Sequence, residues 1–351
     1  MNRPLGFVIM LFALAVAAGP VRAATCPIGV PVVTLPPQTV AGYSWGAVIR
    51  PLGDACIEKL DVDPANDHNW YAGGPAGLYM TKDAGVTWKK PVSGHVHAIL
   101  ISPGAPQLVY AGVDTKLYLS RDSGKTWTVI HAFAKPVYSL LVHGGTLFVG
   151  LAWDNHVAKS GVFASNLGGG GMVFHPFGPG QTGLIVWTLS RDPLSGLIYA
   201  GTEIFDHPQP YHPPFFRSPN NAVTWTNVAG TLPWHVVDSA VRPADGFVYA
   251  LTEGKGVYGS ANQGSTWHPP VVSPGLGIAL KMDPATPMRL YAGRQKVSTL
   301  TGGIFLSTDA GLHFSSIGLD GVTIGDVALN GAVTRIYAAA YGSGIYVSTI
   351  P

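Results

Sequence analysis

The sequence predicts an all-β fold, a seven-bladed β-propeller, and three observations lead to it. An eight-residue pattern at residues 120–127 returns in variant form along most of the 351-residue chain. The composition, with 45 Gly, 29 Pro and 11% charged residues, suits short strands joined by tight turns and argues against long solvated helices. Seven units with the same order of strands can be counted, and seven units of four strands make a β-propeller.

The repeated pattern is a turn. An Asp or Asn accepts hydrogen bonds from backbone amides, a Gly takes a positive φ, and a Trp or Phe anchors the next strand. The copies lie at residues 81–88, 120–127, 218–225, 260–267 and 307–314. Their structural acidic or amide residues are Asp83, Asp122, Asn220, Asn262 and Asp309.

The amino terminus predicts export. Asn2 and Arg3 precede an apolar run over residues 5–18, and Val21-Arg22-Ala23 ends in the form that a signal peptidase accepts. The run is too short to span a bilayer, so we expect no membrane span. We expect a signal peptide at residues 1–23 and one propeller domain at residues 24–351, secreted or periplasmic.

Two cysteines lie in the mature part. In an oxidising compartment we expect a disulfide between Cys26 and Cys56, which would tie the N-terminal segment to the first unit; two free thiols are the alternative. With only two cysteines and no CxxC, nothing supports a cysteine zinc site.

The first unit shows the strand order. An apolar strand ends near residue 63, a second covers residues 70–73, a third covers residues 77–80, and a fourth opens at residue 87. The seven third strands contain residues 78–79, 117–118, 162–163, 215–216, 257–258, 304–305 and 345–346. The last unit stops after its third strand, so we expect the N-terminal stretch 40–45 to supply the fourth and close the ring.

These turns resemble the BNR or Asp-box propellers, whose signature [ST]-x-D-x-G-x-[ST]-[WF] is matched in full at Asp83 and Asp122. That group includes sialidases, xyloglucan-degrading glycoside hydrolases and photosystem II stability/assembly factor-like proteins. The resemblance implies that the box is a structural turn away from the active face. A sialidase is not expected, because Ile49-Arg50-Pro51 has the wrong order for its Arg-Ile-Pro motif and no Tyr-Glu pair is identifiable.

The face opposite the boxes is where we expect binding. Three long loops between second and third strands are predicted at residues 153–159, 203–213 and 294–300, and segments 95–97, 174–177 and 232–235 join them. Phe177 is expected to be exposed there, like the tryptophans and Tyr211. The candidate ligand-binding residues are Lys59, Trp153, His156, Asp206, His207, Tyr211, His212, Trp234 and His235.

Catalysis on a glycan would need two carboxylates facing one cavity. An alignment of the innermost strands gives the column Lys59, Ala98, Ser139, Thr188, Asp238, Ala279 and Asp326. Asp238 and Asp326 therefore become candidate catalytic residues at the channel mouth, with Glu203 as a third. The alternative interpretation is that these aspartates are solvated or bonded to backbone amides and keep the channel open.

The favoured function is a binding scaffold for a protein or a glycan. A glycoside hydrolase or polysaccharide lyase is the alternative, and a metal-dependent enzyme using the histidines of this face is a third. No cofactor is expected other than such a metal ion. The net charge of +2 gives no reason to expect a nucleic-acid partner, and we expect a monomer.

Overall fold

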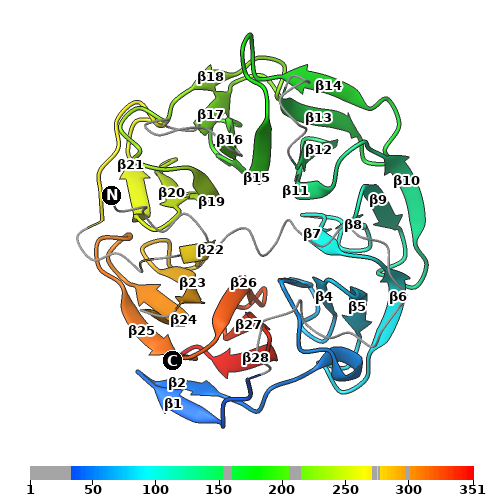
Figure 1. Ribbon diagram of the computed structural model, residues 1–351, viewed down its shortest axis with the longest axis vertical. Helices are drawn as coiled ribbons and strands as arrows, with labels where there is room; N and C mark the ends of the chain where they lie inside the picture. The colour runs from blue at the N-terminus through cyan, green and yellow to red at the C-terminus, as the bar shows by residue number, and fades with distance from the viewer. Residues whose placement is uncertain (1–32, 153–159, 205–214, 271–274, 276, 298–299) are drawn as a thin grey trace, which may run out of the picture.

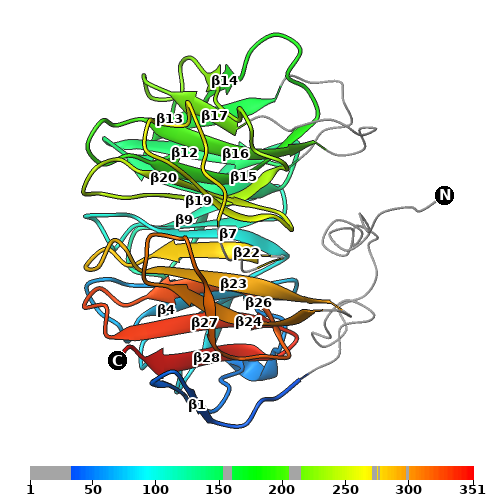
Figure 2. The same cartoon turned by 90° about the vertical axis from the view of Figure 1, so that its left-hand side faces the viewer.

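Seven antiparallel β-sheets stand around a ring in the computed structural model, which describes residues 33–152, 160–204, 215–270, 275, 277–297 and 300–351 (Figure 1). Within these residues the only helical segment is the 3-10 turn Pro51–Gly53. The predicted all-β fold with seven blades is confirmed. Figure 2 shows the blades side-on, packed into a thick disc.

Each blade runs outward from the central channel in sequence order. The innermost strands are β3 (Lys59–Val62), β7 (Val96–Ile101), β11 (Val137–His143), β15 (Leu184–Arg191), β19 (Val236–Val241), β22 (Gly277–Met282) and β26 (Thr323–Leu329). The second strands are β4 (Trp70–Gly74), β8 (Val109–Val113), β12 (Thr146–Leu151), β16 (Ile198–Ile204), β20 (Val248–Thr252), β23 (Leu290–Val297) and β27 (Arg335–Tyr341).

The third strands contain all seven predicted pairs. They are β5 (Gly77–Thr81), β9 (Lys116–Ser120), β13 (Gly161–Asn166), β17 (Phe215–Ser218), β21 (Gly256–Ser260), β24 (Leu300–Ser307) and β28 (Gly344–Thr349). The fourth strands are β6 (Lys89–Ser93), β10 (Thr128–Ala132), β14 (Val173–Pro176), β18 (Thr226–Asn227) and β25 (Ser315–Gly318). In the fifth blade an isolated bridge between Gly259 and His268 takes the place of a fourth strand.

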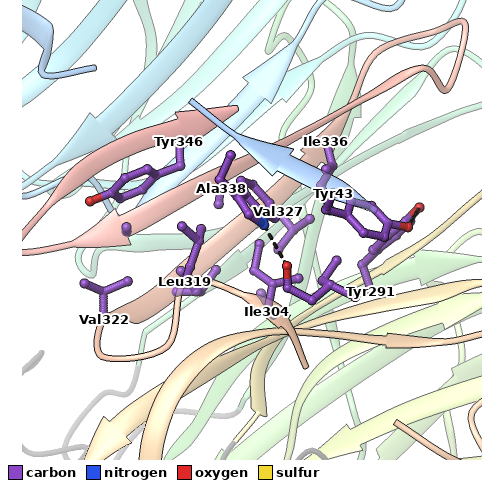
Figure 3. Close-up of a cluster of buried hydrophobic side chains, with 14 residues drawn as sticks. Tyr43, Tyr291, Ile304, Leu319, Val322, Val327, Ile336, Ala338 and Tyr346 are labelled. Carbon is purple, nitrogen blue, oxygen red and sulfur yellow. Dashed lines mark hydrogen bonds between the residues drawn. The ribbon is translucent and has the colours of Figure 1, made fainter. Parts of the chain in front are cut away.

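The seventh blade is completed from the other end of the chain. The hairpin β1 (Gln38–Val40) and β2 (Tyr43–Trp45) lies on its outer side, where Trp45 pairs with Ser348 of β28 (Figure 1). Trp45 also donates from its indole nitrogen to the Ile317 carbonyl at 2.7 Å. Figure 3 shows Tyr43 of the hairpin beside Tyr291 of the sixth blade, in an apolar cluster shared by both blades.

Neighbouring blades are fitted together by a glycine on the second strand. A Cβ added to Gly73 would lie 2.5 Å from Val96, the first residue of the next innermost strand, so a larger residue would collide with it. Between the fifth and sixth blades the large and small residues are exchanged. Leu251 stands at the glycine position of the fifth blade and Gly277 faces it from the sixth, where an added Cβ would lie 2.7 Å from Leu251. The repeated Tyr-Ala-Gly sequence therefore serves blade packing.

The Asp turns have the expected hydrogen bonds. Asp122 Oδ1 accepts from the Thr126 amide at 2.9 Å, and Oδ2 accepts from the Thr126 hydroxyl at 2.7 Å. These bonds, the hydroxyl bond first, lower the Asp122 pKa to about 2. The buried Ser120 hydroxyl accepts from the Gly124 amide at 2.7 Å, and Trp127 donates to the Gly124 carbonyl. Equivalent bonds form around Asp83, Asn220, Asn262 and Asp309.

The two ends of the ring carry different connections. The turn at Ala84 donates to the His68 carbonyl of the loop between the first and second strands, so both lie at one end, the turn face. At the other end, the Asp114 amide between β8 and β9 donates to the His95 carbonyl of the link between blades. Trp234 lies in such a link, between β18 and β19, and so at the end opposite the turns.

Parts of the predicted loop segments are in fact strands, including Val96 and His97 in β7 and Glu203 and Ile204 in β16. Arg294–Val297 belongs to β23, and Lys296 pairs with Thr301 of β24, so the expected long loop over residues 294–300 is wrong. Phe174–Pro176 likewise belongs to β14. Local composition suggested loops because it does not reveal that β23 extends to eight residues or that Val173–Pro176 pairs with β13 as a fourth strand.

Cys56 is buried at the start of the first blade, where its backbone bridges to Tyr341. Cys26 lies outside the described residues, so the disulfide between them stays a prediction. Within the described part of the chain, the structure contains no helix with the length and hydropathy needed to cross a membrane.

Candidate functional site

Near the start of each innermost strand, one residue lies at the central channel. In six blades a β-bulge interrupts the pairing near the start of this strand, as between Val96 and Ala98. The bulged residue then lies at the channel, and Glu58 holds the same place in the first blade. Together these seven residues form what we call the mouth: Glu58, His97, Tyr138, Trp187, Val237, Ile278 and Gly325.

The mouth encloses a cavity of about 90 Å³, the axial pocket, which Lys59 and Gln295 also line. The seven blades contribute unlike residues to it. Blades one to four supply an acid and three rings, whereas blades five to seven supply two aliphatic side chains and a glycine. One wall of the pocket is therefore aromatic and polar and the other is apolar, although the backbone around it is repeated sevenfold.

Rings and acids form a continuous arc around the first half of the mouth. The His97 ring lies 4.0 Å from that of His95 and stacks on Tyr138 at 4.7 Å, and Tyr138 meets Trp187 edge-to-face at 4.8 Å. Trp187 then donates to Glu203 Oε2 at 2.5 Å. Each ring is held by its neighbours, so the arc is rigid before any ligand arrives.

The arc ends in a histidine between two acids. His235 Nε2 lies in close contact with Glu253 Oε2, to which Trp234 also donates at 3.1 Å, and is 3.8 Å from Glu203 Oε1. Burial, with a smaller contribution from Glu253, raises the pKa of Glu203 above its ordinary value. The predicted residues Glu203, Trp234 and His235 thus come together, all buried or half-buried.

At the other end of the arc, Glu58 Oε2 is 2.8 Å from His95 Nε2, and Glu58 Oε1 is buried without a hydrogen-bond partner. The neighbouring His97 stays neutral, because burial, helped by His95 and Lys59, lowers its pKa to about 2. A neutral imidazole both donates and accepts one hydrogen bond.

Asp238 and Asp326 bond to backbone amides of the following blade. Asp238 Oδ2 accepts from the Leu280 amide at 2.7 Å, and Asp326 Oδ2 accepts from the Leu60 amide at 3.1 Å across the joint between the last and first blades. The innermost strand is the edge of its sheet, so these carboxylates satisfy amides that no strand pairs. Neither lines the axial pocket; their catalytic role stays a prediction.

Asp61, two residues after Lys59 in β3, also accepts from an amide of the following blade: the Ile101 amide donates to its Oδ2 at 2.9 Å. Asp61 and Asp238 lie in the channel wall and are half-buried. Burial raises the pKa of each to about 6. Such a carboxylate is ionised at neutral pH at a cost to stability.

Several predicted binding residues lie outside the described part of the chain: Trp153, His156, Asp206, His207, Tyr211 and His212. Phe177, expected to be exposed, is 4% exposed and stacks on Phe216 at 4.0 Å. That expectation is wrong because the ring fills the core between the third and fourth blades. Among the described residues no group of three or more His, Cys, Asp or Glu side chains is arranged to hold a metal ion.

The residues that the sequence alignment placed at the channel lie one position after most of the mouth residues. The aligned column contained Lys59, Asp238 and Asp326, whereas the pocket is lined mainly by the column before it. Side chains of a regular strand alternate between its two faces, so only one of two adjacent columns can face the channel. The bulge changes which of the two columns does so. The available signal was size and chemistry: Glu58, His97, Tyr138 and Trp187 are large and polar or aromatic where the later blades have Val237, Ile278 and Gly325.

Solved structures with a similar fold include the following three. An ancestral GH74 enzyme matches with a TM-score of 0.68 and 15% identity over 94% of this chain, and the chain spans 46% of that enzyme. YCF48 bound to a D1 peptide matches with a TM-score of 0.63 and 14% identity over 92% of this chain and 100% of YCF48. The chain shares their β-propeller fold.

The third is the extracellular domain of the one-component system BT4673 from B. thetaiotaomicron, with a TM-score of 0.61 and 12% identity over 88% of this chain and 40% of that one. A scan of protein-family models and a search of the curated proteins each find no match. At these identities the likeness concerns the fold, and function has to be argued from the mouth.

Proposed function

We propose that this protein is an exported scaffold that binds a protein or glycan ligand at the mouth. The observation that carries the proposal is the contrast between blades at one repeated position. The five turns all begin with a buried Ser or Thr hydroxyl, whereas the seven mouth residues differ and line a pocket. Diversity on a rigid repeated backbone is the arrangement used for recognition.

The aromatic arc supports this role. Trp187 and Tyr138 are half-buried, so each has exposed ring surface, and both are fixed by stacking and by the bond to Glu203. Rigid aromatic side chains are favoured contact residues because little conformational entropy is lost when they bind. YCF48 with its peptide and the GH74 enzymes are consistent with a protein or a glycan ligand respectively.

The test is a binding and product-release screen of the purified mature protein against glycans and peptides. We expect binding without cleavage, and an affinity at least tenfold weaker in Trp187→Ala, on the scale of one lost interface aromatic. Trp127→Ala is the matched control, because this half-buried tryptophan belongs to the turn face. It should lower stability by about 2 kcal/mol and leave affinity unchanged. Equal binding by Trp187→Ala and the wild type would contradict the proposal.

A glycoside hydrolase or polysaccharide lyase is the second candidate, and Glu203 is the observation that favours it. A carboxyl group with a raised pKa keeps its proton toward neutral pH and can serve as a general acid. In that case Glu203→Gln would bind glycan normally and release no product. Product release unchanged in this variant would exclude Glu203 as the acid.

A further inference from the structure

The polar groups that a ligand would meet in the axial pocket are mainly donors. The carboxylate of Glu58 is not open to a ligand, because Oε2 is bonded to His95 and Oε1 is buried. Tyr138 presents a hydroxyl for which no hydrogen bond is formed within the described residues. Burial, helped by Glu58 and Glu203, raises the Tyr138 pKa to about 12, so this hydroxyl keeps its proton and can donate.

Lys59 is the cation of the pocket. No carboxylate among the described residues lies within salt-bridge distance of its ammonium group. The titratable groups around it are Glu58, which lines the same pocket, the neutral His97, and Asp238, whose pKa Lys59 lowers against the larger opposing effect of burial. Asp238 already accepts from two amides and from Thr188, so it is satisfied without the lysine.

The remaining wall suits the face of a ring. Trp187 supplies an aromatic surface, and Val237 and Ile278 supply aliphatic surface across the pocket from the arc. Gln295, 7% exposed, adds an amide that can donate and accept. With Lys59 and Tyr138 as donors, the pocket combines an anion site with an apolar surface of the kind that packs on sugar rings.

Resting on the binding role above, we propose that the axial pocket recognises the carboxylate of an acidic sugar, so that the ligand is a uronate-containing glycan. Lys59 pairs with the carboxylate, the Tyr138 hydroxyl donates to it, and Trp187 packs on the sugar ring. The small cavity of about 90 Å³ admits the carboxylate and the adjoining ring atoms of one residue rather than a whole oligosaccharide.

The experiment uses matched ligands and matched lysines. Calorimetric titration would compare short oligomers of galacturonate, glucuronate and mannuronate with their methyl esters, which keep the ring and lose the charge. We expect at least one acid to bind at least tenfold more tightly than its ester. Lys59→Gln should remove that preference and Lys59→Arg should keep most of it, because the arginine retains the charge.

Lys281→Gln is the control, because Lys281 is an exposed lysine three residues further along β22 than Ile278, beside Asp61 and outside the pocket. This variant should bind the acids as the wild type does. Esters that bind as tightly as the acids, acids that bind Lys59→Gln undiminished, or acidic peptides that bind in preference to the oligomers would each overturn the acidic-sugar proposal.

The same data separate this proposal from the one on which it rests. If a neutral glycan or a peptide binds and Trp187→Ala abolishes that binding, the mouth is a binding site and only the preference for a carboxylate falls. If neither acidic nor neutral ligands bind to the mature protein, both proposals fall.

Discussion

The two ends of the ring are built from the same seven units, yet they differ in how strictly the units repeat. At the turn face, five turns share a buried hydroxyl at Thr81, Ser120, Ser218, Ser260 and Ser307, and each accepts an amide four residues later. At the mouth, the seven equivalent positions carry seven different residues. The repeated end stabilises the blades, and the varied end is suited to recognising something outside the chain.

The inner carboxylates Asp61, Asp238 and Asp326 stand between these two extremes. They lie in the channel like a functional group, but their bonds run to amides of the next blade. In each case an acid replaces the missing partner of an edge strand. We therefore group them with the scaffold, and the first two predictions test that assignment.

The largest expected effect is on the pH dependence of stability. Because the pKa of Asp238 is raised to about 6 from 3.8, the folded state holds a proton between pH 4 and 6 that the unfolded state has released. This acid's contribution to stability is therefore complete below pH 4, falls as the pH rises to 6 and is level above it. A shift of this size corresponds to at most about 3 kcal/mol.

Urea unfolding of the wild type and Asp238→Asn at several pH values between 4 and 8 measures this effect. The asparagine cannot titrate, so the free energy of unfolding of Asp238→Asn should fall less than that of the wild type between pH 4 and 6, by at most about 3 kcal/mol. Parallel curves for the two proteins would show that Asp238 is not the buried titrating group described here.

The next effect concerns the joint between the last and first blades. Asp326→Ala leaves the Leu60 and Val327 amides without their acceptor, which should lower the free energy of unfolding by about 2 kcal/mol. Asp326→Asn retains one acceptor oxygen and should cost less. A purely catalytic Asp326 would instead leave stability unchanged in both variants, as calorimetric melting would reveal.

The smallest effect is expected at the turn face. Ser120→Ala removes the buried acceptor of the Gly124 amide and should cost about 1 kcal/mol without changing ligand affinity. Ser120→Thr keeps the hydroxyl, as Thr81 does in the first blade, and is the control. Loss of ligand binding in Ser120→Ala at unchanged stability would indicate that the ligand binds at the turn face, which would contradict binding at the mouth.

The sequence predicted what repetition encodes. The five turns, the seven third strands and the placement of Trp234 at the end opposite the turns follow from spacing alone, because each unit must bury the same faces against its neighbours. The mouth could not be placed as well. The bulges that bring Tyr138 and Trp187 to the channel have no local sequence signature, and the link between Glu203 and His235 joins residues from two different blades.

The extension of β23 to Val297 was missed for a related reason: its pairing with β24 depends on a partner strand rather than on its own composition. Repeats thus predict a fold better than they predict a site. A site arises where the units depart from one another, and such departures are visible in a sequence only after the register is known.

The central claim is that ligand recognition lies at the mouth and not at the turn face, and hydroxyl-radical footprinting tests it most directly. Half-buried aromatic reporters exist at both ends: Tyr138 and Trp187 at the mouth, and Trp88 and Trp127 in the turns. On addition of a ligand found by the screen, we predict slower modification of Tyr138 and Trp187 and unchanged rates for Trp88 and Trp127. Protection of the turn tryptophans with no change at the mouth would contradict the account.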